Sequence, residues 1–423
     1  MISIILWIIL AILLFEFILE RLLDYLNSTW WSDRLPEELV GIYDEEKYFK
    51  SQNYIRHRQK FSTLVSTLSF FGIFIILSMG GFAYLDNQIL RLTINPIVRA
   101  LLFFGVIGAI ASVLSIPFDA YSTFVIEAKY GFNTTTVRTF LMDILKGWLL
   151  ALVIGGGMMS LIIWIYETTG NYFWLIAWGV ITFFSIFFTL FYSNLIVPLF
   201  NKQSLLEEGD LKDAIKAFAL STGFKMKDIY IIDGSKRSKK VNAYFTGFGK
   251  KRRIVLYDTL IQNHTVDELV AVLAHEIGHN KKRHTLEGLI LSIIQSGIML
   301  FILSLFIQKN SHLADALCQA LGGFAGIGVH QSFHMGVLGF GILYSPISMM
   351  MGILMNMRSR KNEFDADRFA SLNFNPGALQ SALKKLSVDN LSNLRPHPLC
   401  VFFNYSHPPL LQRLNAIRDL SST

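Results

Sequence analysis

The sequence has few charged residues and only two cysteines. Charged side chains make up 16% of its 423 residues, against about 25% in ordinary soluble domains. Apolar residues make up 52%, a composition that argues against a purely soluble or a disordered chain. Cys318 and Cys400 permit at most one disulfide and match no metal-ligand spacing, which excludes a disulfide scaffold and a cysteine-based zinc site.

Long apolar runs are abundant instead. Crossing a hydrocarbon core of about 30 Å takes roughly 20 apolar residues as a helix. The first such run lacks a basic leader and a small-residue cleavage site, and we expect it to be a retained span. We therefore predict a mainly α, polytopic membrane protein with seven transmembrane helices, near residues 3–19, 64–85, 97–118, 145–166, 172–193, 287–308 and 329–355.

The basic residues predict how these spans are oriented. Of the 38 Lys and Arg residues, the alternate loops hold only Arg91, Arg99 and Lys309, and the other 35 lie in four segments, 20–63, 119–146, 194–283 and 356–423. Basic loops stay in the cytoplasm, so we expect these four segments there and the N-terminus outside. The orientation of the chain in the membrane therefore explains the net charge of +7 without a nucleic-acid partner.

The basic run at residues 250–253 has no stacking aromatics arranged as a nucleic-acid platform. Contact with anionic lipid beside the membrane explains it more simply. We therefore expect the lipid bilayer to be a partner and nucleic acid not to be one.

Two polar regions are long enough to fold outside the bilayer. The first contains three expected strands, at 228–233, 241–247 and 253–257, with one helix before them at about 208–222 and another from 266. The second follows the last span. We expect four parts: a membrane domain at 1–200, a cytoplasmic region at 201–286, two further spans at 287–355 and a C-terminal cytoplasmic part at 356–423.

The strongest local motif is His275-Glu276-Ile277-Gly278-His279. Residues four apart share one face of a helix, so His275 and His279 can offer two imidazole nitrogens to one Zn²⁺ per chain, with Glu276 beside the open coordination position. Thr265 with Glu268 forms a capping box that favours a helix here. A catalytic zinc site needs a third protein ligand and leaves its fourth place to water.

Glu363 is the expected third ligand. It lies on a second helix directly after the last span, and Asp367 follows one turn later. If Glu363 binds zinc, Asp367 can reach a ligand histidine, and His275 is the expected one. A carboxylate in that place fixes the tautomer of the ring and raises its basicity.

These residues predict hydrolysis of a peptide bond. Zinc lowers the pKa of bound water to about 7, and Glu276 takes the proton as the water attacks and later passes it to the leaving amine. The oxyanion needs a further donor, for which His407 and Arg413 near the C-terminus are the candidates; a surface position remains the alternative for His407. The sequence names no partner for two more ionisable residues, His284 and Glu287, at the entry to the sixth span.

The zinc helix and several longer strings resemble one family, the type I CAAX prenyl endopeptidases, which are integral-membrane zinc metalloproteases acting on prenylated proteins. The likeness covers nearly the whole chain. It rests on the strings at 117–133, 198–202, 234–238 and 242–249, on Ser359-Arg360, Glu363-Phe364 and Ala366-Asp367, and on Ser406-His407-Pro408-Pro409.

The resemblance implies a zincin-like α+β protease domain on the cytoplasmic side and seven helices around a water-filled intramembrane chamber. It also implies that residues 242–247 form a sheet edge on which substrate lies as an added strand, with Asn242, Ala243 and Tyr244 in contact with it. His275, His279, Glu363 and Glu276 match the family's ligands and base position by position. Before Asn242, Lys239-Lys240-Val241 departs from a more polar, His-containing stretch in eukaryotic relatives.

The expected reaction is removal of the C-terminal tripeptide from prenylated proteins or peptides, in the bacterial inner membrane or the endoplasmic reticulum. The alternative is a quality-control zinc protease that cleaves unprenylated membrane proteins. A transporter is disfavoured because the spans lack midplane charges and paired broken helices. A non-catalytic binder of lipidated proteins is disfavoured because Glu276 is intact.

Overall fold

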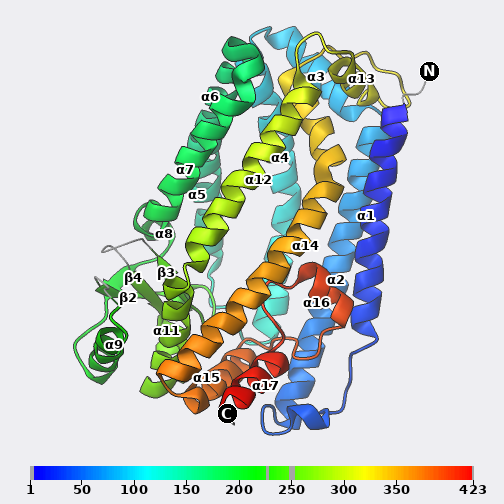
Figure 1. Ribbon diagram of the computed structural model, residues 1–423. Coiled ribbons are helices and arrows are strands. Elements are labelled where there is room, and N and C mark those ends of the chain that lie inside the picture. Colours follow the sequence, from blue (N-terminus) through cyan, green and yellow to red (C-terminus); the bar gives the residue numbers. More distant parts are fainter. Residues whose placement is uncertain (1–3, 225–227, 247–252, 422–423) are drawn as a thin grey trace.

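The computed structural model of this protein describes residues 4–224, 228–246 and 253–421 and is mostly helical. Long helices run along the long axis of the molecule, and a small sheet with several short helices lies at one end (Figure 1). The helices are α1 (Ile4–Ser28), α2 (Glu45–Ser78), α3 (Gly81–Leu92), α4 (Pro96–Tyr121), α5 (Val137–Leu150), α6 (Gly156–Thr169), α7 (Phe173–Leu195), α8 (Val197–Phe200), α9 (Asp210–Ser221), α10 (Asp258–Asn263), α11 (Val266–Lys281), α12 (His284–Ile307), α13 (His312–Ala320), α14 (Phe333–Asn373), α15 (Pro376–Asp389), α16 (Pro398–Asn404) and α17 (Leu410–Ser421).

Five helical segments of the described chain are long and apolar enough to cross a membrane. At most 17% of the most apolar stretch of each is buried inside the protein, which leaves most of these side chains for another apolar medium to cover. One segment holds two of the expected spans, 145–166 and 172–193. The five are Glu45–Ser78, Pro96–Glu127, Val137–Phe200, His284–Ile307 and Phe333–Asn373. This architecture agrees with the expected mainly α membrane protein.

Two expected spans differ from the helices observed. The run at 3–19 lies in the 25-residue α1, which carries Glu16, Glu20 and Arg21 and is not one of the five segments. The span expected at 64–85 ends at Ser78, because Gly80 has a positive φ of 70° and starts a new helix, α3. A Cβ on Gly80 would lie 2.3 Å from the carbonyl oxygen of Gly322, so this turn depends on glycine.

α14 continues beyond the expected span at 329–355 into the second polar region. Its 41 residues correspond to about 60 Å at 1.5 Å per residue. Near its start, His334 Nε2 lies 2.7 Å from Asp86 Oδ1, and Asp86 also pairs with Arg99 of α4. Its buried residues fall at its two ends, Phe333 to Tyr344 and Glu363 to Ser371. One helix thus joins the far end of the bundle to the sheet end.

The sheet contains four strands in the order β1-β2-β4-β3. β1 pairs antiparallel with β2, β2 parallel with β4, and β4 antiparallel with β3. The structure confirms the expected strands at 228–233 and 253–257 to within one residue and shortens that at 241–247, whose last residue lies outside the described residues. The strands are β1 (Gln203–Leu205), β2 (Asp228–Ile232), β3 (Ala243–Thr246) and β4 (Arg253–Tyr257).

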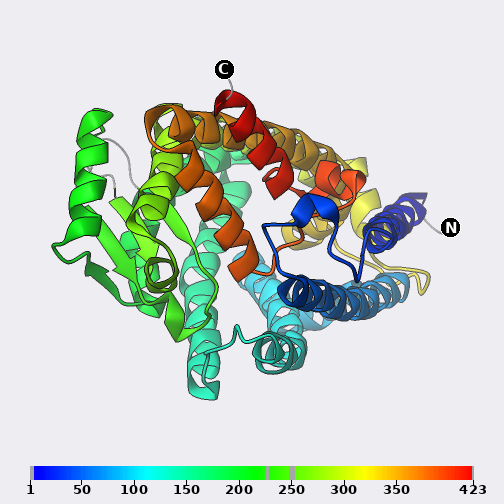
Figure 2. The same cartoon turned by 90° about the horizontal axis from the view of Figure 1, so that it is seen from below.

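α11 lies at the centre of the sheet end. The sheet and α9 flank it on one side and α15 and α17 on the other (Figure 2), and all of them contribute to one hydrophobic core. Thr265 caps the helix as expected, since its hydroxyl accepts from the N–H of Glu268 and the Glu268 carboxylate accepts from the N–H of Thr265. The carboxylate also accepts from Lys385 Nζ at 2.7 Å and Ser381 Oγ at 2.6 Å, both on α15.

We predict that Glu268→Gln destabilises the protein by about 1.5–3 kcal/mol near pH 7, the usual contribution of hydrogen bonds to a charged group. Burial of Glu268 acts to raise the pKa of its carboxyl group, but hydrogen bonds from Lys385, Ser381 and Thr265 outweigh it and lower the pKa to about 2. The stabilisation is therefore present above about pH 4.5 and disappears as the pH falls toward 2. Thermal unfolding of the purified protein across this range measures it.

The matched control is Glu208→Gln. Glu208 also pairs with lysines, but its side chain is 73% exposed, so we expect a change in the unfolding temperature within about 1 °C, because exposed ion pairs contribute little. Equal effects of the two substitutions would show that the Glu268 contacts do not stabilise the fold.

Candidate active site

The two motif histidines face one another on α11. His275 and His279 lie four residues apart, and their Nε2 atoms are 3.1 Å apart. Their rings meet nearly at right angles, with centroids 4.7 Å apart. Both Nε2 atoms therefore point to the same place.

Glu363 of α14 completes this group. Its Oε2 lies 3.4 Å from His275 Nε2 and its Oε1 lies 3.3 Å from His279 Nε2. Within the described part of the chain, these three residues are the one group of histidine, cysteine or acidic side chains whose ligand atoms all lie within 4.8 Å of one another. Residues 88 positions apart in the sequence are thus brought to one point.

A close helix contact makes this possible. A Cβ built on Gly278 would lie 3.1 Å from the Cα and the carbonyl oxygen of Ala366 and 3.1 Å from Phe369 Cβ. Gly278 lies within the histidine motif, and Ala366 follows Glu363 by three residues. The small residues therefore let α11 and α14 approach at the level of the ligand atoms.

Asp367 orients His275 as expected. Its Oδ1 lies 2.8 Å from His275 Nδ1, so this nitrogen donates its proton to the carboxylate and Nε2 keeps a lone pair for a metal. Burial opposes a charge on the ring, but the hydrogen bonds to Asp367 and Glu363 outweigh it and raise the pKa of His275 to about 9. The surroundings thus stabilise positive charge at this imidazole.

Arg413 of α17 holds Asp367 from the other side. Its Nε and Nη2 donate to the two Asp367 oxygens at 2.7 Å each, and its Nη1 lies 3.4 Å from Glu363 Oε2. The side chain is 12% exposed. Two of the three guanidinium nitrogens are therefore occupied by a carboxylate, an arrangement that the sequence analysis did not predict.

His284 lies beside Nδ1 of His279, as Asp367 lies beside Nδ1 of His275. Their Nδ1 atoms are 3.0 Å apart, so with the proton on His279 Nδ1 the lone pair of His279 Nε2 faces Glu363. The sequence named no partner for His284, because residues five apart do not share a face of one helix. Arg283 has a positive φ of 60°, which ends α11 and turns His284 back toward the site.

Glu276 lines a pocket of about 390 Å³ beside His279. Burial raises the pKa of its carboxyl group above the ordinary value, although the neighbouring imidazoles of His275 and His279 act in the opposite direction. A carboxylate with a raised pKa is a better proton acceptor than an ordinary one. Glu287 and Arg358 also line the pocket and form a bidentate ion pair.

His407 reaches the site from the loop after α16. Its Nε2 lies 3.2 Å from Glu363 Oε1 while 64% of its side chain is exposed. Arg360 of α14 holds the chain before this loop, since its Nη1 donates to the carbonyl oxygens of Tyr405 at 2.5 Å and Val401 at 3.1 Å. An exposed imidazole beside the ligands can meet a bound molecule.

The expected substrate strand lies at the end of the sheet, as β3 follows β4 in the strand order. Tyr244 of β3 lines the same pocket as Glu276 and His279, and its hydroxyl lies 3.5 Å from Ser193 of α7. Asn242 directly precedes β3, and its side-chain oxygen accepts from the N–H of Ala243 at 2.8 Å. Of the three predicted residues, Tyr244 is thus the one that lines the pocket beside His279, while Asn242 and Ala243 lie at the start of the edge strand.

The residues present fit a divalent metal. Two neutral imidazoles and one carboxylate are the donor set of several catalytic zinc sites. Glu363 Oε2 is buried and accepts no hydrogen bond within the described structure, which is costly for a carboxylate oxygen unless a cation satisfies it. A metal at the meeting point of these atoms would satisfy it.

Two sequence families match this chain. A family described as CAAX prenyl protease N-terminal, five membrane helices, matches residues 24–202, and peptidase family M48 matches residues 205–421. Similar proteins include "CAAX prenyl protease 1 homolog" of Oryza sativa subsp. japonica, 35% identical over 92% of this chain and 91% of that protein. "CAAX prenyl protease 1" of Saccharomyces cerevisiae is 33% identical over 96% and 93%. The human homologue is 32% identical over 91% and 89%.

One solved structure is also similar over nearly its whole length. The crystal structure of S. mikatae Ste24p superposes with a TM-score of 0.90 at 32% identity and covers 98% of this chain and 99% of that chain. The likeness therefore includes the helical bundle and the sheet end together.

We predict that Gly278→Val weakens metal binding at least tenfold, because its side chain meets the Ala366 backbone and forces α11 away from α14. Changes that misplace ligands or their supports typically cost 10- to 100-fold in affinity. Gly278→Ala should have a smaller effect, since its Cβ is only a few tenths of an ångström too close. Titration with a competing chelator measures the affinity.

The control is Gly72→Ala in α2, where a Cβ meets nothing within 4 Å. Replacing either glycine by alanine raises helix propensity by up to about 1 kcal/mol. A change in stability therefore does not distinguish Gly278 from Gly72, whereas a change in metal affinity does. Unchanged affinity in Gly278→Val would show that the close helix contact does not position the ligands.

Proposed function

Because this chain belongs to the CAAX prenyl protease family of M48 peptidases, it is a membrane metallopeptidase, and we propose that it removes the C-terminal tripeptide from prenylated CAAX proteins. The observation that carries this proposal is the convergence of His275, His279 and Glu363 beside Glu276.

We propose that His275, His279 and Glu363 hold one Zn²⁺ per chain. When bound, zinc lowers the pKa of a coordinated water to about 7 and polarises the scissile carbonyl. Asp367 fixes the His275 ring through the 2.8 Å contact to Nδ1, and His284 does the same for His279. Asp367 is thus a positioning residue.

Glu276 acts as the base in this proposal. Its carboxylate takes a proton from the attacking water and transfers it to the leaving amine. The exposed imidazole of His407 donates a hydrogen bond to the oxyanion. Arg413 positions Asp367 through Nε and Nη2 and places positive charge beside Glu363 through Nη1.

The substrate would add a strand to β3. The Asn242 carbonyl accepts from the N–H of Tyr257 on β4, and hydrogen-bonding direction alternates along a strand. The backbone of Ala243 then faces the outer edge, where the Asn242 side chain occupies its N–H. Substrate pairing would replace that local hydrogen bond, and main-chain pairing holds a peptide extended whatever its side chains.

For the membrane part we propose seven spans, with α1 as the first and α6 and α7 as the fourth and fifth. The middle of α14 contributes no buried residues, and Ile347, Met350 and Leu354 are exposed there, which agrees with a helix that borders lipid or a chamber. The N-terminus would lie outside the cytoplasm and the zincin-like site inside it. We also propose that the chain divides into four parts, with boundaries after residues 200, 286 and 355.

This topology suits the bacterial inner membrane and the membrane of the endoplasmic reticulum. In both membranes the proposed substrates are peptides or proteins. Nucleic acid has no place in the proposal. Residues 250–252 of the basic run lie outside the described residues, and Arg253 contacts Asn194 and Tyr230. A quality-control protease would share the chemistry and differ in its substrates.

We predict that Glu276→Gln keeps the metal while peptide cleavage falls by about 10²–10⁴-fold, the usual contribution of a general base. The matched variant is Glu363→Ala, for which elemental analysis should show depleted metal as well as lost cleavage. Wild-type cleavage by Glu276→Gln would exclude Glu276 as the base, and full metal content in Glu363→Ala would move the third ligand elsewhere.

We further predict that a farnesylated CAAX peptide is cleaved with a kcat/KM at least tenfold above that of the same peptide without the prenyl group. The isoprenoid adds apolar area whose burial contributes about 25 cal/mol per Å². Steady-state assays with the matched peptides measure the ratio. Equal values would favour the quality-control function while leaving the metalloprotease assignment intact.

A further inference from the structure

A second hollow shares no lining residue with the catalytic pocket, although both lie near the end of α7. It has a volume of about 830 Å³ and is formed where α5, α8 and the sheet meet. Tyr230 of β2 lines it, whereas Tyr244 of β3 lines the catalytic pocket. Both tyrosines are register partners of Val255, so they project from the same face of the sheet.

Basic side chains dominate this second hollow. Lys146, Lys202, Lys236 and Arg253 line it together with a single carboxylate, that of Asp233. The Asp233 carboxylate is already engaged, since Oδ1 accepts from Asn201 Nδ2 at 2.9 Å and from the N–H of Lys202 at 2.8 Å. The lining therefore carries a surplus of positive charge.

The cations of the hollow have neutral partners. Lys146 Nζ donates to the carbonyl oxygen of Leu199 at 2.6 Å, and Lys236 Nζ donates to that of Phe200 at 3.4 Å. Arg253 donates to the side-chain oxygen of Asn194. Over the described residues, none of the four cations forms an ion pair with a carboxylate. An anion entering the hollow would be their first charged partner.

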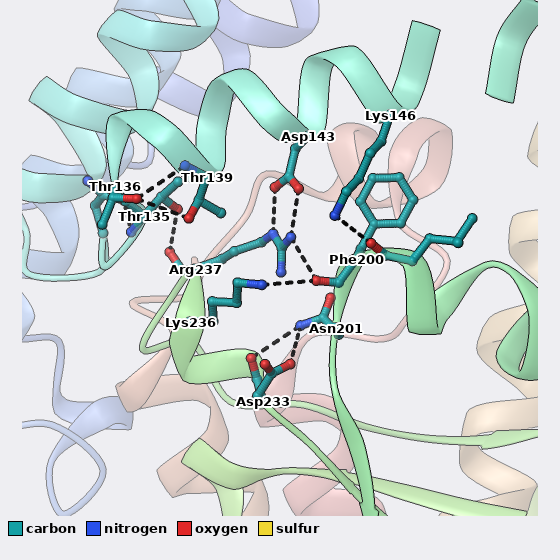
Figure 3. A network of polar contacts seen from close by, with 12 residues as sticks. Thr135, Thr136, Thr139, Asp143, Lys146, Phe200, Asn201, Asp233, Lys236 and Arg237 are labelled. Atoms are coloured by element: carbon teal, nitrogen blue, oxygen red, sulfur yellow. Dashed lines mark hydrogen bonds and ion pairs between the residues drawn. The ribbon is translucent and has the colours of Figure 1, made fainter. Parts of the chain in front are cut away.

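A network of hydrogen bonds links the elements around the hollow. Arg237 donates to both oxygens of Asp143 on α5 at 2.7 Å each and to the carbonyl oxygen of Phe200 at 3.0 Å (Figure 3). Asn201 donates to Asp233 in the same network (Figure 3). The network thereby joins α5, the end of α8 and the loop after β2, the elements that carry Lys146, Lys202 and Lys236.

The hollow also lies where apolar helix surface begins. Leu149 follows Lys146 by three positions on α5, and so shares its face, and its side chain is 62% exposed. Leu199 lines the hollow itself and is 46% exposed. A ligand here would meet cations on one side and lipid-facing leucines on the other.

We propose that this hollow binds the phosphate headgroup of an anionic phospholipid. A phosphate offers several acceptor oxygens and at least one negative charge to the lysines and Arg253, while the acyl chains continue along the exposed leucines. Basic pockets at the membrane interface beside spanning helices bind such headgroups. The site is separate from the catalytic pocket.

The experiment compares the full-length protein with the variant Lys202→Gln/Lys236→Gln, whose two lysines are exposed and carry no catalytic role. Native mass spectrometry in neutral detergent gives the affinity for phosphatidic acid and for phosphatidylcholine. We expect phosphatidic acid to bind wild type at least tenfold more tightly than phosphatidylcholine. The variant should bind phosphatidic acid about 10- to 30-fold more weakly than wild type does, since each basic residue contributes about 1 kcal/mol.

The control variant, Lys216→Gln/Lys384→Gln, removes the same charge from α9 and α15 and should bind phosphatidic acid like wild type. Equal affinity of Lys202→Gln/Lys236→Gln and wild type would overturn the proposal. Inorganic phosphate at millimolar concentration should not displace the lipid. Complete displacement would assign the hollow to free phosphate and overturn the lipid assignment.

A further measurement needs no variant. A photoreactive phosphatidic acid should label wild-type peptides that contain residues 198–203 or Lys236. Labelling confined to other parts of the chain would overturn the proposal even if the variant failed to fold.

Discussion

The active site depends on one close contact between two helices. α11 carries His275, His279 and Glu276, and α14 carries Glu363, so these side chains meet only where the two helices nearly touch. Gly278 and Ala366 allow that approach, since a Cβ on Gly278 would lie 3.1 Å from the Ala366 backbone, a few tenths of an ångström closer than an ordinary contact. The same five-residue motif thus holds two residues that pack, Ile277 in the core and Gly278 against α14, between residues that face the site.

Around that contact, several ionisable groups have a partner that limits their freedom. Asp367 fixes His275, Arg413 fixes Asp367, and His284 fixes His279. Arg360 holds the chain that leads to His407. These supports come from three helices, α12, α14 and α17, so the geometry of the site depends on how these helices pack together.

The part of the site that follows from local spacing could be predicted from the sequence. Residues four apart on a capped helix had to share a face, and Glu363 with Asp367 one turn later offered a ligand and its support. The structure brings these residues together, whereas it places Arg413 on Asp367 and His284 on His279, contacts that depend on tertiary packing and on the positive φ of Arg283. Likewise, no pattern distinguished the end of α2 at Ser78, just before the glycine pair Gly80-Gly81, or the three-residue β1, because a glycine pair and a short strand are compatible with several conformations.

α14 begins beside the buried Asp86 and carries Glu363 thirty residues later, about 45 Å away along a continuous helix. Pro346 lies inside this helix, between its two buried ends, and a proline removes one backbone hydrogen bond from a helix and favours a bend there. The place of the Glu363 carboxylate beside the histidines therefore depends on packing at both ends of α14 and on the angle at which the helix passes Pro346.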